Sequence, residues 1–128
     1  MIFRSLKDIL GTEREVKSPA GKWVSKRLLI RKDEMGFSFH DTTVFAGQEL
    51  EVWYKNHLEA CYCISGEGEV ETPDGKRYSI TPGTIYALDQ HDKHTLHAKT
   101  DLRLICIFNP ALTGTEIPDK DGSYPLLK

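Results

Sequence analysis

Apolar and polar residues alternate along most of the chain from residue 23 onwards, as they do in strands that bury one face. The alternating runs are short, rich in β-branched and aromatic residues, and separated by turn-forming groups at 45–47, 65–66, 73–75 and 81–83. Short strands at this spacing predict an all-β sandwich or barrel, with the jelly roll among the options. The predicted strands are 23–30, 37–45, 49–54, 59–64, 67–72, 76–80, 84–88, 95–98 and 102–108.

The two ends of the chain have a different pattern. Ser5 and Asp8 have the spacing of a capping box, with Asp in place of Glu or Gln, and Gly11 can end the short helix that they predict. Residues 109–128 are rich in proline and glycine and finish in apolar residues. We expect one domain over 1–128, with 109–128 as an extension over or beside the barrel mouth; a frayed terminus is the alternative.

Strand periodicity also assigns side chains to faces. Glu59, Cys61 and Cys63 share one face of the 59–64 strand. In the 102–108 strand both faces are largely apolar, so we expect one face to line the barrel. The other face should then pack on a second sheet or on a second subunit.

Composition excludes several classes of function. The chain has 128 residues, 39% of them hydrophobic and 28% charged, and a net charge of −2, which indicates one globular domain without a basic surface for nucleic acid. Its apolar runs are too short to span a membrane, and its start does not resemble a signal peptide. Three cysteines without a secretion signal indicate reduced thiols and a cytoplasmic location.

The central part of the chain resembles the first motif of the cupin superfamily, G-x5-H-x-H-x3-E-x6-G. Gly47, Glu59 and Gly66 fall in register with that motif, while Trp53 and Lys55 replace its two histidines. The resemblance implies a cupin-type jelly-roll barrel of two antiparallel sheets. The first motif usually supplies two histidines and one carboxylate as metal ligands. This chain keeps only the carboxylate, that of Glu59.

The second cupin motif is also present in altered form. After the glycine and proline of residues 75–83, Tyr86 occupies its histidine position and Gln90 its asparagine position. Glu59, Tyr86 and the later His94 would form a ligand set of two oxygens and one nitrogen, which suits a divalent metal such as Fe(II) or Zn(II) acting as a Lewis acid. The alternative is a metal-free cupin in which Glu59 is only hydrogen-bonded.

Four longer strings, MGFSFHDTT, NHLEACYCISGEGEVET, PGTIYALDQHDKH and FNPALTGTE, resemble the ectoine synthase family over nearly the whole chain. The resemblance implies a hydro-lyase that closes Nγ-acetyl-L-2,4-diaminobutyrate to ectoine, a compatible solute of the osmotic stress response, with loss of water. It implies a metal, expected as Fe(II) with Zn(II) as the alternative, held by Glu59, Tyr86 and His94. It also implies a homodimer with a small-molecule substrate.

Further site residues follow from the same resemblance. Glu116 joins Glu59, Tyr86 and His94 in the catalytic set. The substrate carboxylate needs a cation, for which Arg27 and Lys55 are candidates. The family tends to have a histidine two residues after the glutamate at 116, where this chain has Pro118. The residues implied to bind substrate are Trp23, Arg27, Thr42, Tyr54, His57, Cys106 and Phe108.

Each of these residues also has a plain structural alternative. Arg27 could be a solvated charge at a strand edge, Trp23 could cap the barrel, and Cys106 would be core on its strand alone. At the level of function, two alternatives stay open. One is another metal cupin, an isomerase or a dioxygenase, and the other is a non-catalytic binding module.

Overall fold

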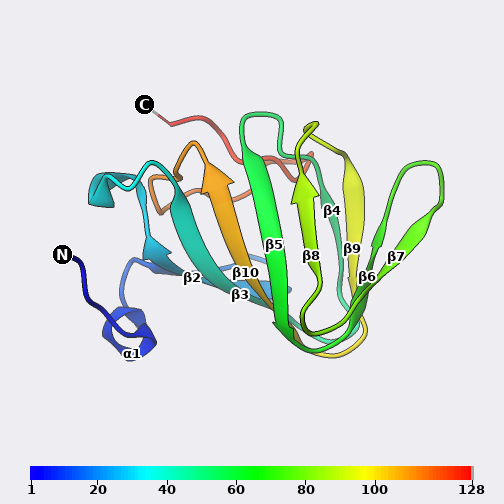
Figure 1. Ribbon diagram of the computed structural model, residues 1–128, viewed down its shortest axis with the longest axis horizontal. Coiled ribbons are helices and arrows are strands. Elements are labelled where there is room, and N and C mark those ends of the chain that lie inside the picture. Colours follow the sequence, from blue (N-terminus) through cyan, green and yellow to red (C-terminus); the bar gives the residue numbers. More distant parts are fainter. Residues whose placement is uncertain (128) are drawn as a thin grey trace.

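Two antiparallel sheets face each other, with one short helix at the N-terminal end, in the computed structural model, which describes residues 1–127 (Figure 1). This arrangement confirms the predicted fold class; Lys128, the last residue of the predicted extension, lies outside the described residues. The elements are α1 (Leu6–Ile9), β1 (Glu15–Lys17), β2 (Trp23–Leu29), the 3-10 helix η1 (Arg31–Asp33), β3 (Ser38–Val44), β4 (Glu49–Val52), β5 (Leu58–Ser65), β6 (Gly68–Glu71), β7 (Arg77–Ile80), β8 (Ile85–Leu88), β9 (His94–Ala98) and β10 (Leu102–Asn109).

Strand order explains how the two sheets come together. The larger sheet runs β1-β2-β3-β10-β5-β8 and the smaller one β4-β9-β6-β7, with antiparallel pairing throughout. Consecutive strands such as β4 and β5, or β8 and β9, belong to different sheets, so the chain crosses between the layers several times. The buried core accordingly draws on both sheets, with Cys61 and Leu104 from the larger and Val70 and Leu96 from the smaller.

The N-terminal helix forms where its capping signal predicts it. The backbone N–H of Ser5 donates to the Asp8 carboxylate at 2.7 Å, and the helix ends just before Gly11, which has a φ of +75°. The sequence did not predict β1, because a strand of three residues gives too little alternation to detect. Its Glu15 pairs with Lys26 at the edge of the larger sheet.

Asp33 ties this N-terminal region together. Its carboxylate accepts hydrogen bonds from Arg4 at 3.1 Å, from Arg14 at 2.9 Å and from the backbone N–H of Ile30 at 2.9 Å. Burial alone would raise the pKa of Asp33, but these donors hold it well below its ordinary value.

On β5 and on β10 one face was predicted to point inward and the other outward, and this prediction is confirmed. The inward side chains of β10 are all buried, and Leu102 at its start is 0% exposed. On β5, Cys61 and Cys63 are buried while Tyr62 lies on the outer face and is 46% exposed. Because side chains alternate along a strand, this one register decides which groups enter the space between the sheets.

The segment after β10 returns to the smaller sheet and lies against the β4–β5 connection. The backbone carbonyl of Gly122 accepts a hydrogen bond from Trp53, and Ser123 Oγ accepts one from the Lys55 N–H at 3.0 Å. Gly122 has a φ of +73°, and a Cβ there would overlap the carbonyl oxygen of Glu51. A glycine is therefore needed for this close approach.

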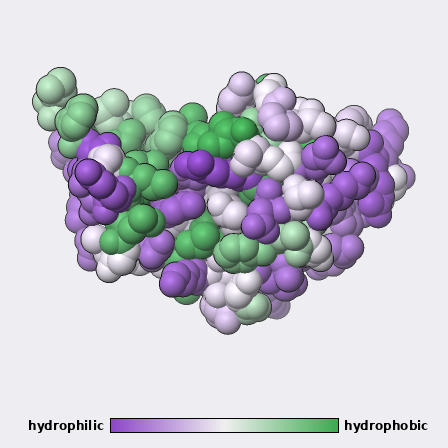
Figure 2. Space-filling model, turned by 90° about the horizontal axis from the view of Figure 1, so that it is seen from below, coloured by the Kyte–Doolittle hydropathy of each residue, from purple (hydrophilic) through white to green (hydrophobic). Residues whose placement is uncertain are grey.

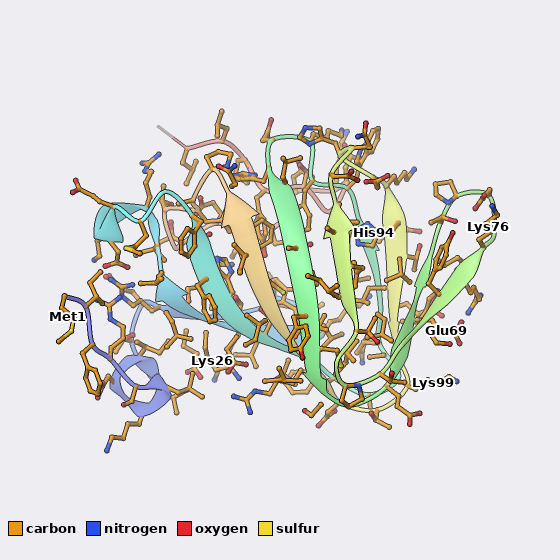
Figure 3. All side chains as sticks on the ribbon, viewed as in Figure 1. Met1, Lys26, Glu69, Lys76, His94 and Lys99 are labelled. Atoms are coloured by element: carbon orange, nitrogen blue, oxygen red, sulfur yellow. The ribbon has the colours of Figure 1, made fainter. Side chains whose placement is uncertain are left out.

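The outer surface differs from one end of the molecule to the other. Figure 2 shows apolar side chains gathered at the end that carries the N-terminal segment and hydrophilic side chains at the end of β6 and β7. Figure 3 shows Lys26, Glu69 and Lys99 at the outside, whereas His94 lies among the strands. Within residues 1–127 there is no helix with the length and apolar character needed to cross a membrane.

Candidate active site

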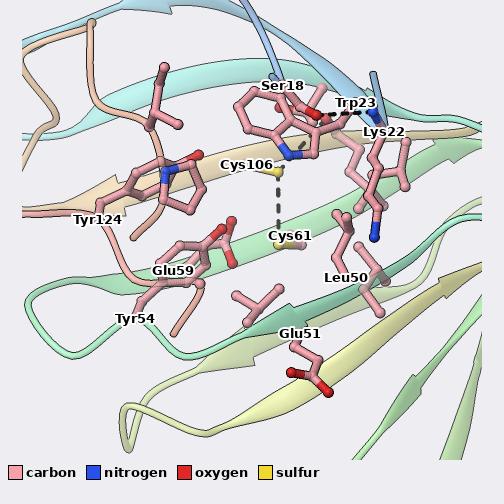
Figure 4. A pocket seen from close by; sticks show the side chains of 18 of the residues that line it. Ser18, Lys22, Trp23, Leu50, Glu51, Tyr54, Glu59, Cys61, Cys106 and Tyr124 are labelled. Carbon is pink, nitrogen blue, oxygen red and sulfur yellow. Dashed lines mark hydrogen bonds between the residues drawn. The ribbon is translucent and has the colours of Figure 1, made fainter. Parts of the chain in front are cut away.

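A cavity of about 370 Å³ lies between the two sheets (Figure 4). Strands of both sheets contribute to its wall, and so does the C-terminal segment through Pro118 and Tyr124. Most of the predicted site residues meet at this cavity. The predicted residues that line it are Trp23, Thr42, Tyr54, Glu59, Tyr86, His94, Cys106 and Phe108.

Glu59 is the buried acid of this cavity. Its side chain comes from β5, and the residue is only 7% exposed. Among residues 1–127, no lysine, arginine or histidine forms an ion pair with it. Burial without a compensating cation raises the pKa of Glu59 to about 8, although contacts with the thiols of Cys61 and Cys106 partly oppose that rise.

Tyr86 and His94 reach the same cavity from β8 and β9, with ring centroids 6.2 Å apart. Burial raises the pKa of the Tyr86 phenol well above its ordinary value and lowers that of the His94 imidazole. The backbone carbonyl of Asp92 lies 2.9 Å from His94 Nδ1, so Nδ1 carries the proton and Nε2 is left as an acceptor. This is the tautomer that a metal-ligating histidine adopts.

The donor set therefore fits a divalent cation. A carboxylate and a phenolate oxygen with one neutral imidazole suit Fe(II) or Zn(II), and a buried carboxyl without a cationic partner gains from a nearby positive charge. Glu59, Tyr86 and His94 all line the cavity, and their role as metal ligands stays a prediction.

Cys61 and Cys106 form a second group beside Glu59. The two residues are opposed across β5 and β10, and their Sγ atoms lie 3.8 Å apart. One ligand atom of each lies within 4.8 Å of a carboxylate oxygen of Glu59 and of the other sulfur (Figure 4). The sequence placed Cys61 on the same strand face as Glu59 and Cys106 among the substrate-binding residues, but it did not predict that the two would meet, because strand order alone decides which positions become neighbours.

Arg27 is buried but does not line the cavity. It is 0% exposed, and its Nε donates to Ser25 Oγ at 3.3 Å. Its Nη1 and Nη2 atoms have no acceptor among the described residues. The guanidinium carbon lies 5.6 Å from the ring centroid of Tyr124, which does line the cavity. Arg27 is therefore a fully buried cation with two unused donors, one side chain away from the cavity.

Comparison with known proteins identifies relatives of this chain. The family model described as ectoine synthase matches residues 1–128. The chain belongs to the ectoine synthase family. The "L-ectoine synthase" of Desulfatibacillum aliphaticivorans is 58% identical over 128 residues, covering 99% of this chain and 98% of that protein. The "L-ectoine synthase" of Halalkalibacterium halodurans is also 58% identical, covering 95% and 94%.

A solved structure supports the same assignment. The crystal structure of ectoine synthase from P. lautus matches this chain with a TM-score of 0.88 and 52% identity, over 99% of this chain and 91% of that one. An RmlC-like cupin from Shewanella frigidimarina matches with a TM-score of 0.63 at 22% identity, which supports the cupin fold alone. The chain is therefore an enzyme of the ectoine synthase type, a hydro-lyase, and not a non-catalytic cupin module.

Like Arg27, two further residues assigned by resemblance to the ectoine synthase family lie outside the cavity wall. His57 is buried, with ring-edge contacts to Phe108 and Tyr124, and its Nδ1 has no partner among residues 1–127. The Glu116 carboxylate accepts hydrogen bonds from the backbone N–H groups of residues 113–115 and from the Thr113 hydroxyl. Burial opposes ionisation of Glu116, but these donors lower its pKa. Its predicted catalytic role stays a prediction, and its visible role is to hold the 113–116 turn.

Other residues of the site were not found from the sequence. Tyr124 stacks on Tyr54 and lines the cavity, but it lies in a proline- and glycine-rich tail without periodicity. His40 also lines the cavity, with its two ring nitrogens 3.3 Å from Ser25 Oγ and 3.0 Å from Ser38 Oγ. His40 belongs to the string MGFSFHDTT, which resembles the ectoine synthase family. That resemblance was the sequence signal by which His40 could have been found.

The remaining expectations concern Lys55 and Pro118. Lys55 Nζ lies 2.8 Å from an Asp121 carboxylate oxygen and 4.3 Å from the Trp53 ring centroid, so it already has partners outside the cavity. Pro118 lines the cavity at the position where the ectoine synthase family tends to have histidine. This chain therefore presents a stiff apolar ring where an imidazole would otherwise reach the cavity.

Proposed function

We propose that this enzyme closes Nγ-acetyl-L-2,4-diaminobutyrate to ectoine, with loss of water and with the help of a divalent metal. The observation that carries the proposal is the position of Glu59, a buried carboxyl that has no cationic partner among the described residues, on a cavity that Tyr86 and His94 also line. The family to which the chain belongs supports the reaction type.

Glu59, Tyr86 and His94 would hold the metal, Fe(II) or Zn(II), through their carboxylate, phenolate and Nε2 atoms. When bound, the metal supplies Lewis-acid stabilisation of negative charge on an oxygen of the substrate. The three residues come from β5, β8 and β9, so the two sheets together fix their positions. Asp92 fixes the tautomer of His94 through its backbone carbonyl.

The cavity wall folds the substrate for an intramolecular reaction. The free 2-amino nitrogen attacks the carbonyl carbon of the acetamide, a six-membered ring forms, and the amide oxygen leaves as water. Trp23, Tyr54 and Phe108 give the wall its aromatic surface, which excludes solvent and holds the two reacting ends together. Both protons of the attacking nitrogen must reach the departing oxygen, and we assign this transfer to the carboxylate oxygen of Glu59 that is left free when the other oxygen binds the metal.

Arg27 is our candidate for binding the substrate carboxylate. A buried guanidinium with two free Nη donors can bind a carboxylate bidentately, and such a pair compensates both buried charges. Lys55 is the weaker candidate, because it already pairs with Asp121. Cys106 keeps the role of a wall residue and not that of a nucleophile. The Cys61 contact lowers the pKa of its thiol, but burial and Glu59 outweigh that effect and raise it.

A two-part experiment tests this function. Metal content is measured on protein purified without an affinity tag, and ring closure is followed with Nγ-acetyl-L-2,4-diaminobutyrate by detection of ectoine. We expect metal in the isolated protein and loss of ring closure when a chelator removes it. An active metal-free protein would reject the role of the metal. A metal-loaded protein that forms no ectoine would instead favour another reaction of a metal cupin, such as isomerisation or dioxygenation.

We also infer that the enzyme is a homodimer. The outer face of the larger sheet carries exposed apolar side chains, and Tyr62 of β5 lies opposite Ile85 of β8 and Ile105 of β10. Ile85 is 64% exposed and Ile107 on the same face 37%. A second copy of the chain that covers this face would remove these side chains from water.

A further inference from the structure

The pair formed by Cys61 and Cys106 has no role in the proposed ring closure. Both thiols are buried, and both are free cysteines. They come from directly opposed positions of β5 and β10, so the pairing of two central strands fixes their separation. Figure 4 shows the two sulfurs facing each other at the cavity, with Glu59 from the same strand as Cys61 close by.

The distance between the two sulfurs matches a known coordination geometry. A thiolate lies about 2.3 Å from zinc, so two thiolates on one tetrahedral zinc ion are about 3.8 Å apart. The Sγ atoms of Cys61 and Cys106 are 3.8 Å apart. A disulfide would require about 2.05 Å. The two sulfurs therefore already have the spacing of two ligands of one metal ion.

Glu59 can supply the third ligand. A carboxylate oxygen of Glu59 lies within 4.8 Å of each sulfur, which is close enough for all three atoms to reach one ion after side-chain rotation. Thiolate ligands favour soft and borderline cations, whereas Tyr86, the partner of Cys61 across β5 and β8, and His94 favour harder ones. Glu59 therefore belongs to two neighbouring donor sets of different chemistry.

We propose that Cys61, Cys106 and Glu59 form a separate binding site for one thiophilic d10 cation, represented by Zn²⁺ and Cd²⁺, with the fourth coordination position open to the cavity. Binding breaks the two S–H bonds and, where the Glu59 carboxyl is protonated, its O–H bond, and these protons leave to solvent as the metal–ligand bonds form. No electron is transferred. The sequence contains neither a C-x-x-C motif nor a similar zinc signature, since the two ligands come from strands far apart in the chain.

The position of this site has a consequence for the enzyme. Glu59 belongs to both donor sets, so an ion held by the cysteines withdraws it from Tyr86 and His94. Occupation by a thiophilic cation should therefore exclude the metal that we assign to ring closure and inhibit the enzyme. This consequence rests on the proposed function, whereas the existence of the thiol site does not.

Cd²⁺ is a suitable probe, because its bond to a thiolate gives an ultraviolet charge-transfer band at longer wavelength than that of Zn²⁺, which overlaps the peptide absorption. The metal-free full-length chain is titrated with Cd²⁺, and the band is followed to saturation. We expect one Cd²⁺ per chain, loss of the band in Cys61→Ala and in Cys106→Ala, and at least a tenfold weaker affinity in Glu59→Gln. Because Cd²⁺ binds thiolates more tightly than Zn²⁺ does, protein loaded first with Zn²⁺ should still develop the band, but at a higher Cd²⁺ concentration.

Two control variants make the result specific. Cys63 shares the inward face of β5 but lies outside the cavity wall, with its thiol directed at the backbone carbonyl of Ser65 at 3.4 Å, so Cys63→Ser should keep the band. His94→Ala removes a ligand of the proposed metal for ring closure, and it should keep the band too. Cysteine variants that unfold, as judged by circular dichroism, are replaced by Cys→Ser variants.

The outcomes separate the two proposals. A band that is absent from the parent protein, or that persists in both cysteine variants, overturns the thiol site and leaves the proposed ring closure untouched. A band that depends on both cysteines supports the thiol site even in a protein that forms no ectoine.

Discussion

Tyr124 stacks on Tyr54 with ring centroids 5.1 Å apart and an interplanar angle of 12°. Tyr54 follows β4, whereas Tyr124 comes from the last few residues of the chain, so the stack joins the C-terminal segment to the cavity wall. Phe108 meets both rings edge-on. The C-terminal segment thus forms part of the cavity wall.

Tyr124→Ala should therefore damage both stability and catalysis. Deleting a large buried aromatic ring costs about 3 kcal/mol in the free energy of unfolding, and it opens the cavity to water. We expect kcat/KM for ring closure to fall at least tenfold. Urea denaturation and steady-state kinetics measure the two effects. Tyr124→Phe keeps the stacking ring, and Leu126→Ala alters an exposed side chain of the same segment, so both should stay close to the parent enzyme.

Glu59→Ala should abolish metal uptake, because it removes the carboxylate around which the proposed ligands are arranged. Metal content by elemental analysis provides the measurement. Glu51 also lines the cavity but is exposed to solvent, so Glu51→Ala is the matched control and should keep its metal. Normal metal stoichiometry in Glu59→Ala would remove Glu59 from the ligand set.

Arg27→Met should raise the KM for Nγ-acetyl-L-2,4-diaminobutyrate by at least about tenfold, because hydrogen bonds to a charged group contribute about 1.5–3 kcal/mol each. The same substitution removes an uncompensated buried charge, so the free energy of unfolding should stay level or rise. If Arg27 had only a structural role, Arg27→Met would leave KM unchanged and would make the protein less stable. Lys26→Met, on the neighbouring position of β2, should leave KM unchanged.

Stability at low pH should depend on Asp33. Its pKa in the folded protein lies well below the ordinary value of 3.8, so its ionised form stabilises the fold above that value. The contribution is lost as the pH falls through the folded-state pKa, because the folded protein must then take up a proton. Asp33→Asn should cost about 1–3 kcal/mol at pH 7 and should approach the parent stability in acid.

Urea denaturation at a series of pH values measures this dependence. Glu13→Gln breaks an exposed ion pair with Lys32, in which both side chains are more than half exposed, and should change stability by less than about 1 kcal/mol. Parallel pH curves for Asp33→Asn and the parent protein would contradict the assignment.

Ile85→Lys should convert the inferred dimer to a monomer, because a charge on the outer face of the larger sheet cannot be buried without a partner. Sedimentation at micromolar concentration measures the change. Leu126→Lys alters a comparably exposed apolar residue, 59% exposed, in the C-terminal segment, and it should stay dimeric. A monomeric parent protein would refute the dimer itself.

Much of the fold follows from local pattern. Alternation predicted nine of the strands and the inward faces of β5 and β10, since period-2 hydrophobicity is enough to separate buried from exposed positions. The capping-box spacing of Ser5 and Asp8 predicted the N-terminal helix. The two altered cupin motifs predicted that Glu59 and Tyr86 belong to one metal site. Strand β1 and the 3-10 helix are too short to leave such a pattern.

Only the tertiary structure decided which distant residues meet. The pairing of β5 with β10 brings Cys61 opposite Cys106, and the returning C-terminal segment adds Tyr124 to the cavity. It also left Arg27 buried with two free donors. Side-chain type and spacing determine what each strand can bury, but contacts between residues far apart in sequence depend on strand order and register, which no local pattern encodes.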